Sequence, residues 1–300
     1  MNPSIDFSPS IPPEIWEPLC GVWENYVYTI HDDCDFVTND IKFVYIYVLA
    51  TNFSNYKKEG KNGGAVHLIN CGIHCNDANF IDCVSLSGAG GGMLINSTLD
   101  MTNNATFSNV LFLRCKALYG GAVFIYTDSD LFNISFDGCR FESNEALKTK
   151  PSNSKNEYLF GRSAMLIMSN GFTIYSSSFT HNKGYGSVKI YNSFMKKSML
   201  QESQNSILIH CCDFDEEENS KGSINYIDEK SNANVDIVDC KFKGNIKKGS
   251  YYIDGKLINK EKLHVASCNF KNDINNHVNV KLTNNEIKKI NQFYVQKAWL

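Results

Sequence analysis

The stretch GGAVFIYTDSDLFNISFDGCRFESN, residues 120–144, holds the pattern that decides the fold. Two glycines open an apolar run, and Cys139 later follows Phe136 by three positions and precedes Phe141 by two. Apolar residues two positions apart share one face of a strand, whereas a step of three reverses the face. Phe136 and Cys139 can therefore face one core only if the chain bends between them, where it reads Asp-Gly.

This pattern recurs seven times along the chain when each copy is aligned on one small residue. The aligned residues are Cys83, Cys115, Cys139, Ser177, Cys212, Cys240 and Cys268. The positions three and five before them are apolar in every copy, namely Phe80 and Ala78, Phe112 and Val110, Phe136 and Ile134, Ile174 and Phe172, Ile209 and Ile207, Ile237 and Val235, and Val265 and Leu263. Two positions after them stand Ser85, Ala117, Phe141, Phe179, Phe214, Phe242 and Phe270. The number of residues between successive aligned positions varies, as is typical of solenoid turns with loops of different length.

A glycine motif alternates with these copies and indicates where the next strand begins. It reads Gly63-Gly64-Ala65-Val66, Gly90-Gly91-Gly92-Met93 and Gly120-Gly121-Ala122-Val123, with weaker copies at Gly186, Gly222 and Gly249. Glycine supplies positive φ and allows close approach of stacked backbones. The sequence therefore predicts an all-β protein, a right-handed parallel β-helix with three short strands per coil. Antiparallel hairpins in a propeller or sandwich would require more Asn-Gly turns, such as that at Asn170-Gly171, than the sequence contains.

Composition limits the partners of this chain. The 29 basic and 32 acidic residues leave a formal charge of −3, so no basic field exists to hold nucleic acid. The longest apolar run, Phe43 to Ala50, is too short for a transmembrane helix. Residues 1–20 lack a basic segment followed by an apolar stretch, so no signal peptide is predicted there.

The repeat predicts three regions. Residues 1–40 are expected to form an N-terminal capping segment, and residues 41–282 the parallel β-helix. Residues 283–300 are expected to form a C-terminal capping helix, because Thr283 and Glu286 have the spacing of a capping box. Two polar segments, Lys148 to Tyr158 and Lys196 to Ser206, interrupt the repeat and are predicted to leave the solenoid as loops.

The repeats resemble a known family. The segments Gly63-Gly64-Ala65-Val66 and Gly120-Gly121-Ala122-Val123, together with Phe141-x-x-Asn144, Phe179-x-x-Asn182 and Phe242-x-x-Asn245, resemble the GGA[ILV] and FxxN repeats of polymorphic outer-membrane proteins. The resemblance covers roughly residues 60 to 270 as repeat style. It implies a β-helical passenger that is displayed at a cell surface and used in adhesion. The chain is equally similar to uncharacterised β-helix families of eukaryotic microbes.

Acidic clusters were considered because β-helices also host pectate lyases and polygalacturonases. Hydrolysis of a glycosidic bond uses two carboxyl groups about 5 to 9.5 Å apart. The candidates are Asp32, Asp33 and Asp35 before the repeat, and Asp213 and Asp215 with Glu216 to Glu218. Neither group has an identifiable partner, and the sequence motifs of those enzymes are absent. We interpret both clusters as solvated and predict no catalytic residue.

Thiol, imidazole and amide groups are also interpreted as structural. Cys71, His74 and Cys75, with His67 nearby, contain zinc donors but no matching second pair of cysteines. The aligned cysteines are expected to be buried free thiols, since stacked Cβ vectors are parallel and do not face each other for a disulfide. Amides of the FxxN motifs, Asn144, Asn182 and Asn245, are expected to stack along the rod. N-glycosylation sequons begin at Asn52, Asn96, Asn104 and Asn133.

The expected function is that of a non-enzymatic solenoid, a surface-associated adhesin-like scaffold that binds glycans or surface proteins. The alternative is a polysaccharide-degrading enzyme on the same pectin lyase-like fold. The sequence predicts no cofactor and no metal, and it does not identify the binding residues.

Overall fold

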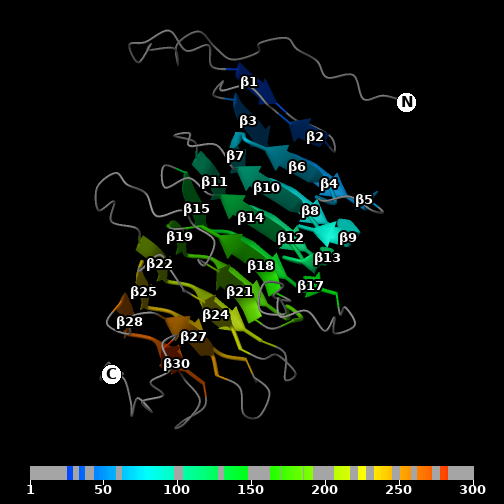
Figure 1. The fold of residues 1–300 in the computed structure, drawn as a ribbon. Coiled ribbons are helices and arrows are strands. Elements are labelled where there is room, and N and C mark those ends of the chain that lie inside the picture. The colour runs from blue at the N-terminus through cyan, green and yellow to red at the C-terminus, as the bar shows by residue number, and fades with distance from the viewer. Residues whose placement is uncertain are drawn as a thin grey trace, which may run out of the picture.

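The protein is a parallel β-helix, as the sequence predicts (Figure 1). The computed structural model describes residues 26–29, 34–37, 44–58, 63–97, 104–127, 132–147, 163–169, 171–184, 186–191, 206–216, 222–227, 233–244, 251–257, 262–271 and 278–282. Their strands form four stacked sheets, A to D, in which every pairing joins a strand to its equivalent in the next coil in parallel.

The strands of each sheet follow one another at intervals of one coil. Sheet A contains β1 (Tyr26–Thr29), β3 (Val44–Leu49), β7 (Gly72–Asn76), β11 (Asn104–Ser108), β15 (Asn133–Asp137), β19 (Phe172–Tyr175), β22 (Ser206–His210), β25 (Asn234–Val238) and β28 (Leu263–Ala266). Sheet B contains β2 (Cys34–Val37), β6 (Val66–Ile69), β10 (Met93–Ser97), β14 (Val123–Thr127), β18 (Ser163–Met168), β21 (Gly186–Tyr191), β24 (Ile224–Ile227), β27 (Ile253–Leu257) and β30 (Val278–Leu282).

Sheets C and D are built from shorter strands. Sheet C contains β4 (Asn52–Ser54), β8 (Asn79–Ile81), β12 (Leu111–Leu113), β16 (Arg140–Glu142), β20 (Ser178–Thr180), β23 (Asp213–Asp215), β26 (Lys241–Phe242) and β29 (Asn269–Phe270). Sheet D contains β5 (Lys57–Lys58), β9 (Val84–Ala89), β13 (Lys116–Tyr119) and β17 (Glu145–Ala146). Each coil that has a strand in sheet D therefore contributes strands to sheets A, C, D and B, in that order along the chain. The prediction of three strands per coil misses sheet D.

The predicted bend is present at the corner between sheets A and C in all eight coils that have both strands. One residue there adopts the left-handed conformation, and these residues are Ala50, Asp77, Asn109, Gly138, Ser176, Cys211, Asp239 and Ser267. A single left-handed residue turns the chain and changes which face its side chains occupy. The corner between sheets C and D also has one left-handed residue per coil, at Asn55, Asp82, Arg114, Ser143 and His181.

These two similar corners make the alignment of the first two copies wrong. Cys83 and Cys115 follow strands of sheet C, whereas Cys139, Cys212, Cys240 and Cys268 follow strands of sheet A. The strand register pairs Phe80 with Phe112 and Phe112 with Phe141. The true equivalents of Cys139 in the earlier coils are Ala78 and Val110. Both corners require a small buried residue three positions after an inward one, so the local pattern is the same.

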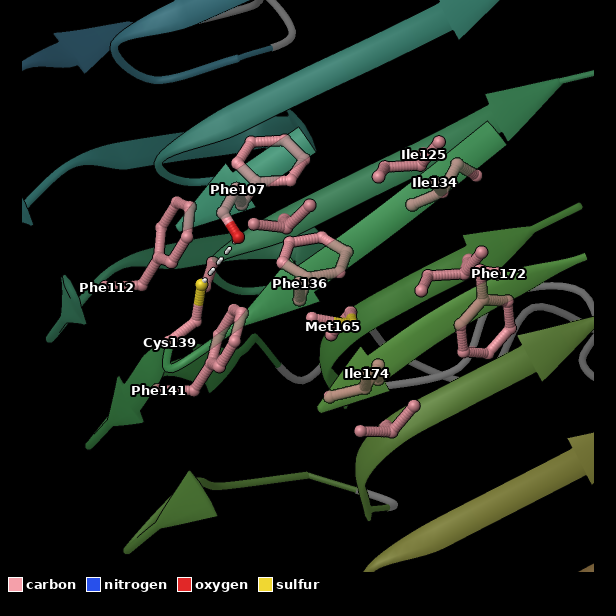
Figure 2. Close-up of a cluster of buried hydrophobic side chains, with 14 of the residues drawn as sticks. Phe107, Phe112, Ile125, Ile134, Phe136, Cys139, Phe141, Met165, Phe172 and Ile174 are labelled. Atoms are coloured by element: carbon pink, nitrogen blue, oxygen red, sulfur yellow. Dashed lines mark hydrogen bonds between the residues drawn. The ribbon is translucent and has the colours of Figure 1, made fainter. Parts of the chain in front are cut away.

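One column of phenylalanine rings runs through the core under sheet C. Phe53, Phe80, Phe112, Phe141, Phe179, Phe214, Phe242 and Phe270 stack with centroids 4.7–5.0 Å apart and planes within 10° of parallel. Figure 2 shows Phe112 and Phe141 beside the inward residues of sheets A and B, including Ile134 and Ile125. Thirteen of the fourteen apolar residues predicted to face inward are buried, and Val265 is partly buried. The core is therefore the shared interior of the coils.

The glycine motif places backbone against backbone. Gly63, Gly90 and Gly120 have positive φ, and the glycine after each one lies on the next coil. A Cβ atom on Gly91 would lie 2.1 Å from the carbonyl oxygen of Gly121. No side chain fits at this position, which explains the second glycine of the motif.

The ends of the chain are described only in part. Two strands, β1 and β2, lie within residues 1–40 and add to sheets A and B. The predicted C-terminal helix, residues 283–300, lies outside the described residues, as do the predicted loops at 148–158 and 196–205. Within the described ranges, no helix has the length and apolar character needed to cross a membrane.

Candidate functional site

The outward side chains of sheet A form an open, mostly uncharged surface, which we call the sheet A wall. Burial alternates along its strands, so that every second residue points outward. The wall consists of the outward residues of β3, β7, β11, β15 and β19, which are Tyr45, Tyr47, Leu49, His74, Asn76, Asn104, Thr106, Ser108, Asn133, Ser135, Asp137, Thr173 and Tyr175. It stops at β19 because the next outward residue of the same column, on β22, is the apolar Leu208, and beyond it Asp236 and His264 pair with each other at 3.1 Å. All are partly or fully exposed.

The strand register arranges the wall in straight columns. The central column runs Tyr47, His74, Thr106, Ser135 and Thr173, one residue per coil. Neighbouring strands are about 4.8 Å apart, so this column is about 19 Å long. The wall thus presents one polar or aromatic group at each coil along a line parallel to the axis of the helix.

Some polar groups of this column are fixed by contacts between coils. The Nδ1 atom of His74 lies 2.7 Å from the hydroxyl of Thr106, and the His74 ring packs against Tyr47 with centroids 5.6 Å apart. The amide of Asn133 donates to that of Asn104 at 3.3 Å in the adjacent column. These contacts hold the side chains in place against the sheet, so the wall is preorganised.

Other polar groups of the wall have no hydrogen-bond partner among the described residues. The hydroxyls of Ser135 and Thr173 form no hydrogen bond with any described residue, and Tyr175 is 46% exposed. At the other end of the wall the ring of Tyr45 lies over Gly72, since a Cβ atom there would be 2.8 Å from Tyr45 Cε1. Burial raises the pKa of the Tyr45 phenol, which therefore stays protonated.

The outer face of sheet B differs because a buried apolar cluster covers part of it. Leu166, Met168, Tyr191 and Ile227 form a separate hydrophobic cluster, each at most 8% exposed. Among them Lys189 is only 5% exposed, and burial lowers its pKa to about 8. Partly exposed polar residues lie on the same face to either side of this cluster, at His67, Asn96, Asn225 and Asp254.

The outer face of sheet C and its corner carry charges that pair with each other. Arg114 binds Asp82 in the adjacent coil through two hydrogen bonds of 2.8 and 2.7 Å, and the guanidinium lowers the pKa of that carboxyl. Lys243 binds Asp213 at 2.9 Å. Exposed ion pairs such as these contribute little stability. This face also carries the exposed charged residues Arg140, Glu142 and Lys241.

The acidic candidates are only partly brought together. Asp213 and Asp215 point outward from β23 on the same face, while Glu216 is buried at the end of that strand. Asp35 lies in β2, on a different sheet. Asp32, Asp33 and residues 217–218 lie outside the described residues.

The zinc donors do not converge. Cys71 and Cys75 are fully buried, whereas His74 points outward to Thr106. His67 belongs to β6 of sheet B, one sheet away from β7. In the described part of the chain, no group of three or more His, Cys, Asp or Glu side chains is placed to bind a metal ion.

The cysteines and FxxN amides act as hydrogen-bond donors between coils. The thiol of Cys139 donates to the carbonyl oxygen of Phe107 in the preceding coil at 3.5 Å (Figure 2), and Cys115 donates to Phe80 in the same way. Asn144 occupies the equivalent position to Cys115 one coil on and donates to Phe112 at 2.9 Å. The nine cysteines whose side chains the structure describes are free thiols, and Cys211 alone among these nine is exposed.

Burial keeps these thiols protonated. Desolvation raises the pKa of Cys139 to about 12, and hydrogen bonding to Cys212 with desolvation raises that of Cys240 to about 12. Because the thiolate is the reactive form, these groups are chemically inert in the folded protein.

The sequons lie at different depths. Asn52, Asn104 and Asn133 are exposed at the starts of their strands, and two of these belong to the sheet A wall. Asn96 is partly buried, and its Oδ1 atom has no hydrogen-bond partner.

Sequence reasoning did not identify the sheet A wall. Its residues are ordinary polar and aromatic residues between the apolar positions, and only the register of the strands places them in columns. Comparison with protein-family models, with curated proteins and with solved structures finds no match to this chain.

Proposed function

We propose that the protein is a non-enzymatic β-helical scaffold, adhesin-like in character, that binds glycans or surface proteins through its outer wall. The observation that carries this proposal is the sheet A wall. Five successive strands of sheet A carry outward hydroxyl, amide and aromatic groups at one spacing with a single carboxylate, whereas the outer face of sheet B holds a buried apolar cluster and that of sheet C carries several charged side chains. A rigid array of this kind suits recognition because little entropy is lost on binding.

A panel of immobilised neutral and acidic polysaccharides, together with intact cells, tests the proposal. Saturable binding of the purified protein to any of these surfaces, without breakdown of the glycan, is the expected result. Absence of binding to every polysaccharide and to the cells would contradict it.

The alternative function is polysaccharide cleavage, and one observation favours it. Asp213 and Asp215 point outward from the same strand two positions apart, which places their Cα atoms about 7 Å apart. Inverting glycosidases hold their carboxyl groups at about 6.5 to 9.5 Å. Against this function, the ion pair with Lys243 occupies Asp213. New reducing ends after incubation with polysaccharides, lost in the variant Asp215→Asn, would establish the enzyme in place of the scaffold.

A further inference from the structure

From the sheet A wall we infer a specific ligand class, a linear neutral polysaccharide that lies along the axis of the β-helix. This inference rests on the proposed function and adds the chemistry of the ligand and its direction. The ligand would cross β3, β7, β11, β15 and β19 at right angles to the strands, over the central column from Tyr47 to Thr173.

The first argument is charge. The sheet A wall contains one carboxylate, Asp137, and no lysine or arginine. A polyuronate or a nucleic acid requires cationic groups to replace its counterions. The nearby cations Lys243 and Arg114 belong to other faces and are paired with aspartates. A neutral chain is therefore the polymer that the wall accommodates without unpaired charge.

The second argument is the type of polar group. Sugar hydroxyls both donate and accept hydrogen bonds, and so do the hydroxyl and amide side chains of the wall. In the described part of the chain the hydroxyls of Ser135 and Thr173 have no partner, and the hydrogen bond between Asn133 and Asn104 leaves an acceptor on one amide and a donor on the other. These groups are available to a ligand without breaking a contact of the fold.

The third argument is periodicity and length. A linear polysaccharide repeats one unit along its length, and the wall repeats one position per coil at about 4.8 Å. Apolar faces of sugar rings pack on aromatic side chains, and the wall has such side chains at both ends, Tyr47 with Tyr45 in β3 and Tyr175 in β19. A chain over the central column would start on Tyr47, pass the ring of His74 and end among hydroxyls at Thr173, with Tyr175 two residues to one side on the same strand.

The test uses the whole chain, produced without glycosylation so that Asn104 and Asn133 stay unmodified. Titration calorimetry measures binding of cello-, manno- and chito-oligosaccharides, from disaccharides to hexasaccharides, beside polygalacturonate oligomers of the same lengths. For at least one neutral series we expect affinity to increase with length and to level off when the oligomer spans the wall. The polygalacturonate series should bind more weakly at every length.

The double variant Ser135→Ala/Thr173→Ala tests the site. It removes two hydroxyls that bind no residue within the described ranges, so the folded state should melt like the parent. We expect binding to weaken about tenfold, which corresponds to about 1.4 kcal/mol and to the loss of about two neutral hydrogen bonds. The matched control is Ser178→Ala/Thr180→Ala, which removes two outward hydroxyls from β20 of sheet C and should leave binding unchanged.

The outcomes separate the two proposals. Binding of acidic oligomers only, or neutral binding that the sheet A variant leaves intact, overturns the inference while the scaffold function stands. Absence of binding to any polysaccharide or cell surface overturns both. Length-dependent neutral binding that the sheet A variant weakens and the sheet C variant does not supports both.

Discussion

Replacement of Asn144 by alanine tests the hydrogen-bonded ladder at the corner between sheets C and D. Asn144 is fully buried; its Oδ1 atom accepts from the backbone N–H of Cys115 at 2.9 Å, and its Nδ2 group donates to the carbonyl of Phe112 at 2.9 Å. The variant leaves the buried N–H of Cys115 without its acceptor, which costs about 1–3 kcal/mol, and removes two further buried hydrogen bonds of about 1 kcal/mol each, from Nδ2 to Phe112 and, at 3.1 Å, to Oδ1 of Asn182. We therefore expect the free energy of unfolding to decrease by about 3–5 kcal/mol.

Equilibrium unfolding in urea, followed by circular dichroism, measures this change. The matched control is Asn79→Ala, because Asn79 forms an exposed amide hydrogen bond of 2.6 Å to Asn52 on the same sheet. The control should change stability by no more than about 0.5 kcal/mol, as surface substitutions usually do. If Asn144→Ala is no more destabilising than Asn79→Ala, the buried amide does not hold adjacent coils together and the reasoning fails.

Three further predictions concern stability. Gly91→Ala should lower the free energy of unfolding, measured in urea, by about 1–3 kcal/mol, because its Cβ would lie 2.1 Å from the oxygen of Gly121. An unchanged urea midpoint would show that the two coils can move apart to accommodate the Cβ atom at no cost. Because burial raises the pKa of Cys139 to about 12, the folded state holds this proton longer than the unfolded chain, and stability should fall from about pH 8.5 to 12. Cys139→Ala should make that decline shallower, and an identical slope would refute the assignment. Burial lowers the pKa of Lys189 to about 8, so the folded protein releases this proton at a lower pH than the unfolded chain does. The free energy of unfolding should therefore increase as the pH rises from about 8 to 10.4. Lys189→Met should raise the free energy of unfolding at pH 7 by up to about 3 kcal/mol, and a loss of stability would contradict a desolvated ammonium.

The fold was largely predictable because its signal is local. Each corner reverses which face the side chains occupy, and the residues on either side, such as Phe136 and Cys139, must both be buried. A pattern over a few residues therefore reports the bend, and repetition reports the stacking. The structure confirms a parallel β-helix on these grounds.

The wrong alignment of the first two copies of the repeat also has a local cause. The corner after sheet A and the corner after sheet C use the same device, a left-handed residue followed by a small buried one. The segments that end at Cys115 and at Cys139 therefore look equivalent in sequence, although they lie at different corners. Only the register across coils, in which Phe112 pairs with Phe141, separates them.

The sequence by itself determined the coil, because burial of alternate residues and the bend between them are properties of neighbouring positions. It did not determine the sheet A wall. Thr106, Ser135 and Thr173 lie 29 and 38 residues apart along the chain, and they align only because parallel strands from successive coils stack in register. Variable loops hide that register in the sequence, whereas hydrogen bonding between coils fixes it in the folded protein.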